Sequence, residues 1–165
     1  MNKNEKIISE TDLTDQVIFS SFKHRGFFTF LCDLIPERHK ERFVIQNQVP
    51  GLVKKRGVLY AFELNGKLIK IGSTTTSFKD RVQSYNCGKK AYRKSGTCST
   101  TNYFVLQSLL NINKPVRVFG YFPKEIKIDV FGTKETIALP PKRFEKKLLT
   151  QLKKDGKLPI LCTQQ

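Results

Sequence analysis

The sequence predicts an α+β fold built around a small antiparallel sheet. Residues 57–72 hold two short apolar runs on either side of an Asn-Gly pair, a pattern typical of a β-hairpin. Apolar residues then recur at helical spacing over residues 77–85, 99–111 and 140–154, and a β-rich run, VRVFGYF, precedes the last of these helices. We therefore expect a three-stranded sheet flanked by helices.

The first part of the chain is expected to be helical. Residues 11–34 carry an apolar, Phe-rich series, with a cap near Thr11 and a stop at Pro36, and Gly26 can divide this helix into two. A charged segment follows it. We divide the chain into an N-terminal helical arm or subdomain, residues 1–50, and a core, residues 51–165, with a basic loop and a C-terminal tail.

The loop of the hairpin decides which side chains share a face. A two-residue type I′ loop between strands 58–63 and 67–72 would put Tyr60 and Lys70 on opposite faces. A three-residue loop, 64–66, with a bulge at its glycine places Tyr60 directly across from Lys70 on one face. We predict the bulged loop.

The remaining elements follow in order after the hairpin. A helix runs from about Ser77 to Tyr85, with Arg81 at the margin of its inner face, and a Gly- and Lys-rich loop comes after it. The next helix is capped by Ser99 or Thr100 and runs to about Asn111. A strand at 116–122, an irregular stretch at 124–139 with short strands, and a helix from Pro140-Pro141 to about Lys154 complete the chain.

Two charged residues stand at apolar positions. Lys70 interrupts an otherwise aliphatic strand, and Glu145 falls inside the arc of the last helix that Phe144, Leu148 and Leu149 also occupy. A buried charge is costly unless it is paired, so each residue needs a partner. For Glu145 the choice lies between an internal ion pair with a basic residue and a ligand for a hard divalent metal ion.

The net charge indicates a polyanionic partner. Thirty Lys and Arg against 14 Asp and Glu give a formal charge of +16, and nucleic acid is the first candidate. The N-terminus lacks an apolar segment of signal-peptide length, and no apolar run approaches the length that spans a membrane. We expect a cytoplasmic protein without a membrane partner.

The motifs around these residues resemble the GIY-YIG nuclease superfamily over residues 57–154. The matching positions are Val58-Leu59-Tyr60, the run Lys70 to Thr74, Arg81 and Glu145. Val58 stands where the family has a glycine, and Lys70 where many members have tyrosine. The stretch from Arg81 to Leu110 and the terminal CTQQ resemble a group of small type II restriction endonucleases within the superfamily, compact homodimers that cut short palindromic sites.

The resemblance implies a role for each residue of the candidate site. Tyr60 would be the general base, with Lys70 beside it favouring the phenolate. Arg81 would clamp the scissile phosphate with its planar guanidinium. Glu145 would hold one Mg²⁺, for which Mn²⁺ can substitute, and Ser73 would contact the phosphate, with a base role for it left open.

A second set of residues is expected to bind DNA. The basic loop would follow the phosphate backbone or enter a groove, and it comprises Lys89, Lys90, Tyr92, Arg93 and Lys94. Six polar side chains are candidates for reading base edges: Gln83, Asn86, Ser99, Asn102, Gln164 and Gln165. Thr100 also belongs to the set that is expected to bind DNA.

These observations predict a site-specific type II restriction endonuclease that cuts both strands of a short palindromic site in double-stranded DNA. Two active sites require a homodimer, whose interface we expect at the Phe-rich N-terminal arm or near the strand at 119–122. A cognate methyltransferase would act on the same site in the cell. The alternative is a non-catalytic nucleic-acid-binding protein on the same scaffold; a repair or homing nuclease is a third, although no appended DNA-reading domain is evident.

Overall fold

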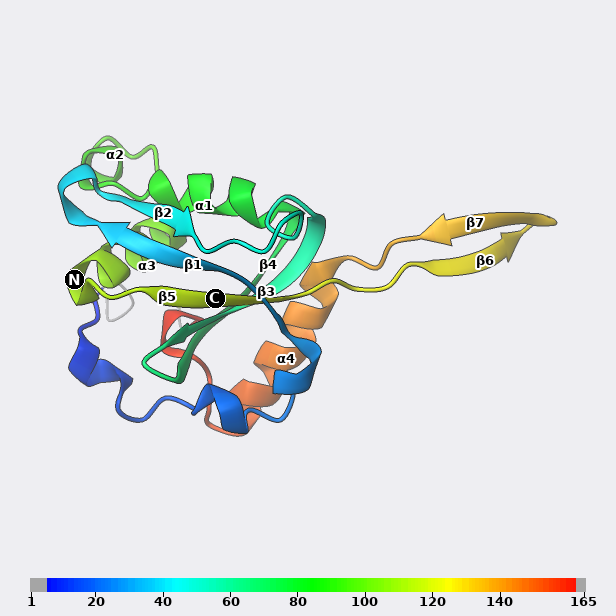
Figure 1. The fold of residues 1–165 in the computed structure, drawn as a ribbon, viewed down its shortest axis with the longest axis horizontal. Helices are drawn as coiled ribbons and strands as arrows, with labels where there is room; N and C mark the ends of the chain where they lie inside the picture. Colours follow the sequence, from blue (N-terminus) through cyan, green and yellow to red (C-terminus); the bar gives the residue numbers. More distant parts are fainter. Residues whose placement is uncertain (1–5, 163–165) are drawn as a thin grey trace.

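Five antiparallel strands form the sheet at the centre of the protein (Figure 1). The computed structural model describes residues 6–162. The strands follow the spatial order β2-β1-β5-β3-β4, so β2 and β4 are the edges. Their bounds are β1 Thr29–Glu37, β2 Arg42–Gln46, β3 Arg56–Leu64, β4 Lys67–Ser77 and β5 Val116–Tyr121.

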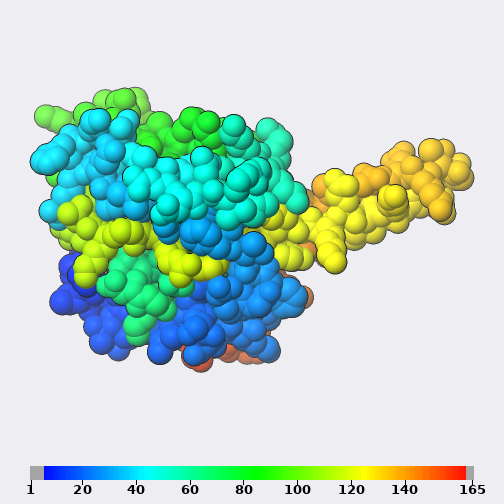
Figure 2. Space-filling view, in the orientation of Figure 1, coloured from blue at the N-terminus to red at the C-terminus, as the bar shows by residue number. Residues whose placement is uncertain are grey.

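Helices cover the sheet, and a separate hairpin projects from it. The α-helices are α1 Phe78–Asn86, α2 Lys90–Lys94, α3 Thr100–Ile112 and α4 Pro141–Lys154. Short 3₁₀ helices are η2 Glu10–Leu13, η3 Phe19–Ser21, η4 Arg25–Phe27, η5 Arg38–Lys40 and η6 Ile160–Cys162. The projecting hairpin consists of β6 Ile126–Val130 and β7 Thr133–Ile137, and it stands clear of the body in Figure 2.

Alternating side chains of the central strands divide the core into two layers. Val58, Tyr60 and Phe62 of β3 pack with residues of α1 and α3 on one face of the sheet. Leu59 and Ala61 pack on the other face with α4 and with Phe19, Phe22 and Phe28. This period-two alternation is typical of a strand that is buried on both sides.

The N-terminal part of the chain is not the helix expected over Thr11–Leu34. It contains three short 3₁₀ helices and then β1, which pairs with both β2 and β5. Short apolar runs rich in phenylalanine fit a strand as well as a helix, and periodicity alone does not separate the two. The sheet consequently has five strands rather than three, and residues on either side of residue 50 contribute to it.

The β3–β4 hairpin has a tighter loop than expected. Leu64 pairs with Lys67 across a two-residue turn in which Asn65 and Gly66 both have positive φ, 51° and 76°, so the three-residue loop is wrong. The bulge lies further along the ladder, where Ile69 is an extra residue opposite the Phe62–Glu63 step. Beyond it Phe62 pairs with Lys70 and Tyr60 with Gly72. Tyr60 and Lys70 therefore still share a face, two positions apart along the ladder.

Helices α1, α3 and α4 agree with the sequence prediction, whereas α2 is a short helix inside the stretch that was expected to be a loop. Ser77 caps α1 by accepting a hydrogen bond from Asp80 N, and Ser99 caps α3 by accepting one from Asn102 N. Helix α4 begins at Pro141. Residues 124–139 contain the two expected short strands, paired with each other as β6 and β7. Among the described residues, no helix combines the length and the apolar character needed to cross a membrane.

A close approach at Gly120 yields a stability prediction. An added Cβ would lie 2.7 Å from Leu31 Cδ1 and 3.0 Å from Val58 Cγ2, and both side chains are fully buried. We expect Gly120→Ala to lower the free energy of unfolding by about 1–3 kcal/mol, because the core cannot yield without strain. Chemical denaturation measures this change. The control is Gly26→Ala, where no atom lies within 4 Å, and an equal loss in both variants would contradict the argument.

Candidate active site

Five residues singled out in the sequence meet in one pocket at the edge of the sheet. They are Tyr60 from β3, Lys70 and Ser73 from β4, Arg81 from α1 and Glu145 from α4. Gly72, Ser99, Thr101 and Lys142 complete its lining. The pocket thus gathers one phenol, one carboxylate and three basic side chains.

The edge position of β4 lets groups from both faces of the sheet meet. Gly72 pairs with Tyr60 and Ser73 with Leu59, so Tyr60 and Ser73 point to opposite faces. A Cβ on Gly72 would lie 2.5 Å from the Tyr60 hydroxyl oxygen. Glycine at this position is therefore required for the phenol to cross over β4 and reach the edge.

Lys70 is buried, with 2% of its surface exposed. Its Nζ donates a hydrogen bond to the carbonyl oxygen of Leu161 in η6 at 3.3 Å. The neighbouring Cys162 Sγ donates to Ile71 O and accepts from Ile71 N, both at 3.3 Å, so η6 covers the β4 edge next to the pocket. The C-terminal turn therefore holds the lysine in the active-site layer.

Tyr60 belongs to a buried hydrogen-bonded trio that includes a second tyrosine. The Tyr60 and Tyr85 hydroxyl oxygens are 2.6 Å apart, and Arg81 Nε donates to the Tyr60 oxygen at 3.2 Å. The Arg81 guanidinium also lies over the Tyr85 ring, 4.3 Å from its centroid. The sequence indicated only that Tyr85 packs inward. Its position four residues after Arg81, on the same side of α1, is the signal that could have identified it as a partner of the site.

Burial keeps both phenols protonated. It raises the pKa of Tyr60 and of Tyr85 above the usual value, and for Tyr60 the proximity of Tyr85 adds to this rise. Lys70 and Arg81 lower the pKa of Tyr60, but they do not outweigh burial. Lys70 therefore favours the phenolate of Tyr60, as expected, but burial opposes it and the net effect is a raised pKa. Burial also opposes the Arg81 cation, yet the two phenol oxygens outweigh it and raise the pKa of Arg81.

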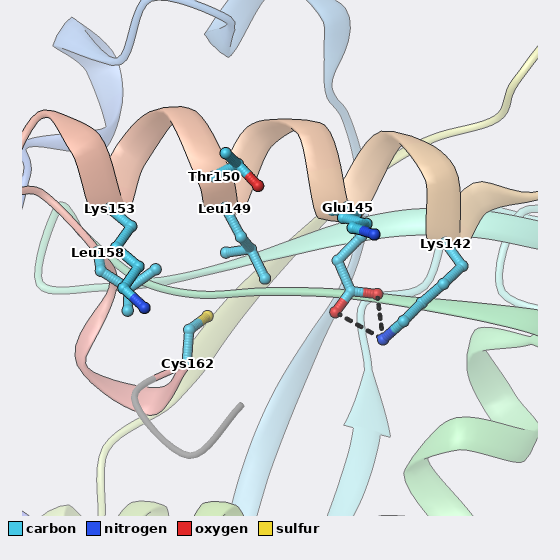
Figure 3. Close-up of a pocket in the computed structure, with 8 residues that line it drawn as sticks. Lys142, Glu145, Leu149, Thr150, Lys153, Leu158 and Cys162 are labelled. Carbon is cyan, nitrogen blue, oxygen red and sulfur yellow. Dashed lines mark hydrogen bonds and ion pairs between the residues drawn. The ribbon is translucent and has the colours of Figure 1, made fainter.

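Glu145 forms an ion pair with a basic residue, which was one of the two alternatives that the sequence left open. Its side chain is 3% exposed, and it pairs with Lys142 Nζ, which lies 3.5 Å from each carboxylate oxygen (Figure 3). Ser73 Oγ also donates a hydrogen bond to it. Lys142 itself is 70% exposed, so this ion pair is easily exchanged for another cation.

The donor set fits a magnesium ion rather than a metal cage. Within residues 6–162 no three His, Cys, Asp or Glu side chains cluster as a metal site. A hard cation at Glu145 would therefore have one protein carboxylate, with water and phosphate oxygens as its other ligands. Mg²⁺ is commonly bound in this way because it retains several of its waters.

The basic loop forms α2 and the segment that leads to α3. Lys90, Tyr92 and Lys94 are exposed, Lys89 is half-buried at the N-cap of α2, and Arg93 donates a hydrogen bond to Thr100 Oγ1 at 2.9 Å. This bond ties the loop to the start of α3. Because Ser99 and Thr101 line the pocket, the basic residues lie a few positions from its rim.

The candidate base-reading residues are in different situations. Gln83 is exposed on α1, and Ser99 both caps α3 and lines the pocket. Asn86 accepts a hydrogen bond from Phe43 N and donates one to Phe43 O, so its amide is committed to holding α1 against β2. Asn102 Oδ1 is buried without a hydrogen-bond partner in the described part of the chain. Gln164 and Gln165 lie outside the described residues.

Comparison with known proteins assigns the chain to a family of nucleases. It matches the structure of the restriction endonuclease HPY188I in complex with product DNA with 43% sequence identity and a TM-score of 0.76, covering 99% of this chain and 96% of the other. At this identity, over nearly all of both proteins, the chain belongs to the restriction-endonuclease family of HPY188I. No protein-family model and no curated protein matches the sequence.

A more distant match shares the fold. The structure of a point mutant of EndoII from bacteriophage T4 aligns with 22% identity and a TM-score of 0.56, covering 78% of this chain and 90% of that one. The same α+β arrangement therefore extends beyond the family.

The buried phenols make an alkaline titration informative. At a pH near the usual tyrosine pKa of about 10, the folded protein should show fewer phenolates than the same chain in denaturant, because burial keeps Tyr60 and Tyr85 neutral. These pKa values are raised in the folded state, so their contribution to stability is complete below pH ~10 and is lost as the pH rises further. Ultraviolet absorbance counts the phenolates.

Tyr60→Phe and Tyr85→Phe identify the protected groups. Each should reduce the difference between folded and denatured protein by one tyrosine. A phenolate at Tyr60 in the folded protein at neutral pH would contradict the burial argument.

Proposed function

We propose that this protein is a Mg²⁺-dependent type II restriction endonuclease that hydrolyses both strands of a short palindromic site in double-stranded DNA, with GIY-YIG chemistry. One observation carries the proposal: Tyr60, Lys70, Arg81 and Glu145, distant in sequence, line a single pocket. The neighbour with 43% identity supports it, since that protein is a restriction endonuclease bound to its DNA product.

The pocket suits a phosphodiester because cations dominate its lining. Lys70, Arg81 and Lys142 face one carboxylate, Glu145. The Nε of Arg81 donates to Tyr60 and its guanidinium also lies over Tyr85, and the terminal nitrogens would bind phosphate oxygens. The first turn of α3, with Ser99 and Thr101, adds the N-terminal end of a helix, which favours an anion. These groups bind the scissile phosphate and offset the negative charge that develops on it.

Tyr60 is the group that accepts the proton of the attacking water. Its hydroxyl lies at the edge of β4, beside two cations that stabilise a phenolate once it forms. Because burial favours the phenol, only a small fraction of molecules carries the base at neutral pH. Tyr85, 2.6 Å away, holds the hydroxyl in position and shares its proton.

Glu145 is the residue that would hold Mg²⁺, with Ser73 hydrogen-bonded to its carboxylate. When bound, the ion supplies positive charge to the phosphate and stabilises the leaving 3′ oxygen, and Mn²⁺ can replace it. Lys142 is paired with this carboxylate in the free protein, and the pair must separate before the ion binds.

Cutting both strands of a palindrome requires two such sites related by a twofold axis, so the active species is a homodimer on DNA. The basic loop, residues 89–94, supplies phosphate contacts, and a methyltransferase that modifies the same site would protect the host DNA. Gln83, Ser99 and Asn102 stay candidates for base reading.

Plasmid cleavage tests the proposal. Supercoiled DNA should give linear fragments of defined size only with Mg²⁺ or Mn²⁺, and Glu145→Gln should abolish cutting because the neutral amide binds the cation poorly. Arg81→Lys should reduce it strongly, since lysine lacks the planar fork. Asp155→Asn, an exposed change at the end of α4, is the control. Binding without cleavage, indifferent to both site variants, would select the non-catalytic nucleic-acid-binding alternative.

Tyr60→Phe separates catalysis from binding. Only a hydroxyl is removed, so DNA affinity should be unchanged while the rate falls by about 10²–10⁴. The wild-type rate should also rise with pH below the raised pKa of Tyr60, because the phenolate fraction increases, and this rise should vanish in the variant. Single-turnover rates across pH, with Tyr103→Phe as control, measure both effects. A variant that binds DNA weakly and keeps the pH dependence would assign Tyr60 a structural role.

A further inference from the structure

A hollow beside the candidate active site runs along one face of α4. Its volume is about 200 Å³, and its lining residues are Lys142, Glu145, Lys146, Leu149, Thr150, Lys153, Leu158 and Cys162. Lys142 and Glu145 line the active-site pocket as well, so the two depressions adjoin. Figure 3 shows these two residues at one end of the hollow and Lys153 toward the other. A long ligand in the active-site pocket can therefore continue along α4.

Three lysines form a single row along this hollow. Lys142, Lys146 and Lys153 fall within an arc of about 40° on α4, and successive members are about 6 and 10 Å apart along its axis. All three side chains are exposed. Like charges one turn apart, such as the first two, destabilise a helix. The row therefore does not serve the stability of α4 and requires another explanation.

No acidic side chain balances the outer part of this row. Lys142 pairs with Glu145, but within residues 6–162 neither Lys146 nor Lys153 forms an ion pair. Exposed lysines are often surrounded by water alone, and α4 carries six basic residues against one acid. The position of the row distinguishes it, because Arg143 and Lys154 of the same helix line neither the hollow nor the active-site pocket. Unbalanced ammonium groups next to a pocket that suits a phosphodiester indicate an anionic ligand.

The hollow also offers apolar surface. Leu149 and Cys162 are buried, Leu158 is half-buried, and exposed Thr150 adds a hydroxyl group. A DNA strand presents both charged phosphates and the carbon skeleton of its sugars, and proteins contact both parts of the backbone. Lysines along an apolar floor match this combination, whereas a small inorganic anion would use the lysines alone.

The two sides of the active site determine which part of a strand would lie in the hollow. Tyr60 belongs to one face of the sheet, whereas Ser73, which is hydrogen-bonded to Glu145, points to the other. The attacking and leaving oxygens of a reacting phosphate are roughly in line. With water on the Tyr60 side, as in the proposed function, the leaving 3′ oxygen faces Glu145 and hence the hollow. The nucleotides attached to that oxygen are those on the 5′ side of the cut.

We propose that the row of Lys142, Lys146 and Lys153, which we call the α4 track, binds backbone phosphates of the DNA strand on the 5′ side of the scissile bond. This inference rests on the proposed function and adds to it the path and polarity of the strand. Lys142 lies next to the scissile phosphate, and the two outer lysines contact phosphates farther from the cut. Contacts to phosphate carry no sequence information, so the α4 track strengthens binding to any sequence and holds the strand in position.

The salt dependence of duplex binding tests the α4 track without metal or cleavage. Each phosphate contact releases counterions and contributes about 0.9 to the slope of log Kd against log salt concentration. The double variant Lys146→Gln, Lys153→Gln should therefore lower this slope by about 2 and keep the circular dichroism spectrum of wild type. The control, Arg143→Gln with Lys154→Gln, removes the same charge from exposed positions of the same helix and should keep the slope. An equal change in both double variants, or no change in either, would overturn the proposal.

Uncharged phosphate analogues locate the α4 track on the strand. A methylphosphonate is placed at one position at a time on either side of the mapped cut, and Kd is measured for each duplex. A substitution just 5′ of the cut should weaken binding by wild type and add nothing in the Lys146→Gln, Lys153→Gln variant, because the contact is already lost. A substitution 3′ of the cut should weaken both proteins equally. Coupling to the 3′ side instead would overturn the polarity.

The outcomes separate this inference from the proposed function. A protein whose slope changes as expected but which does not cut DNA refutes the function and, with it, the polarity of the strand, but retains the α4 track. A protein that cuts DNA while the outer-lysine variant keeps the wild-type slope refutes the α4 track alone. A wild-type protein that binds no duplex refutes both.

Discussion

The pairing of β3 with β4 is the constraint on which the site depends. A type I′ turn starts the ladder, and the extra residue Ile69 shifts it by one position before Lys70 is reached. Without that bulge Lys70 would point to the opposite face from Tyr60, because side chains alternate at every residue. One inserted residue therefore decides whether an ammonium and a phenol meet.

Two buried charges have different means of compensation. Lys70 donates to a backbone carbonyl of η6, in a layer that also contains the Tyr60 and Tyr85 hydroxyls. Glu145 has a mobile counterion, an exposed lysine one turn away on its own helix, and a serine hydroxyl. Removing a partner from a buried charge costs more than the pair itself contributes. Lys70 is consequently compensated by a backbone carbonyl, whereas Glu145 depends on an exposed lysine and a hydroxyl.

The sequence was sufficient where local signals agree with the fold. Ser77, Ser99 and Pro141 mark helix starts by local hydrogen bonding and fixed φ, so α1, α3 and α4 were predicted within a residue or two. Lys70 and Glu145 stood out because their charge conflicts with their apolar neighbours. The helix prediction for residues 11–34 was wrong because the phenylalanines there pack against Phe119 and α4. These residues are distant in the sequence, so the local pattern does not reveal the contacts. Tyr85 was missed since its partner, Tyr60, lies 25 positions away and is joined to it only by the tertiary fold.

The outer edge of β4 explains why the pocket lies where it does. Val17 and Ile18 bond to the start of this edge, and η6 covers it at Ile71. The stretch from Gly72 to Ser77 is left uncovered, and there the strand reads Ser-Thr-Thr-Thr, with charged groups of the pocket on both sides. Another chain can add a strand to an uncovered edge of this kind, and polar and charged residues disfavour that addition. The polar and charged groups around the pocket thus also disfavour the addition of a strand to this edge.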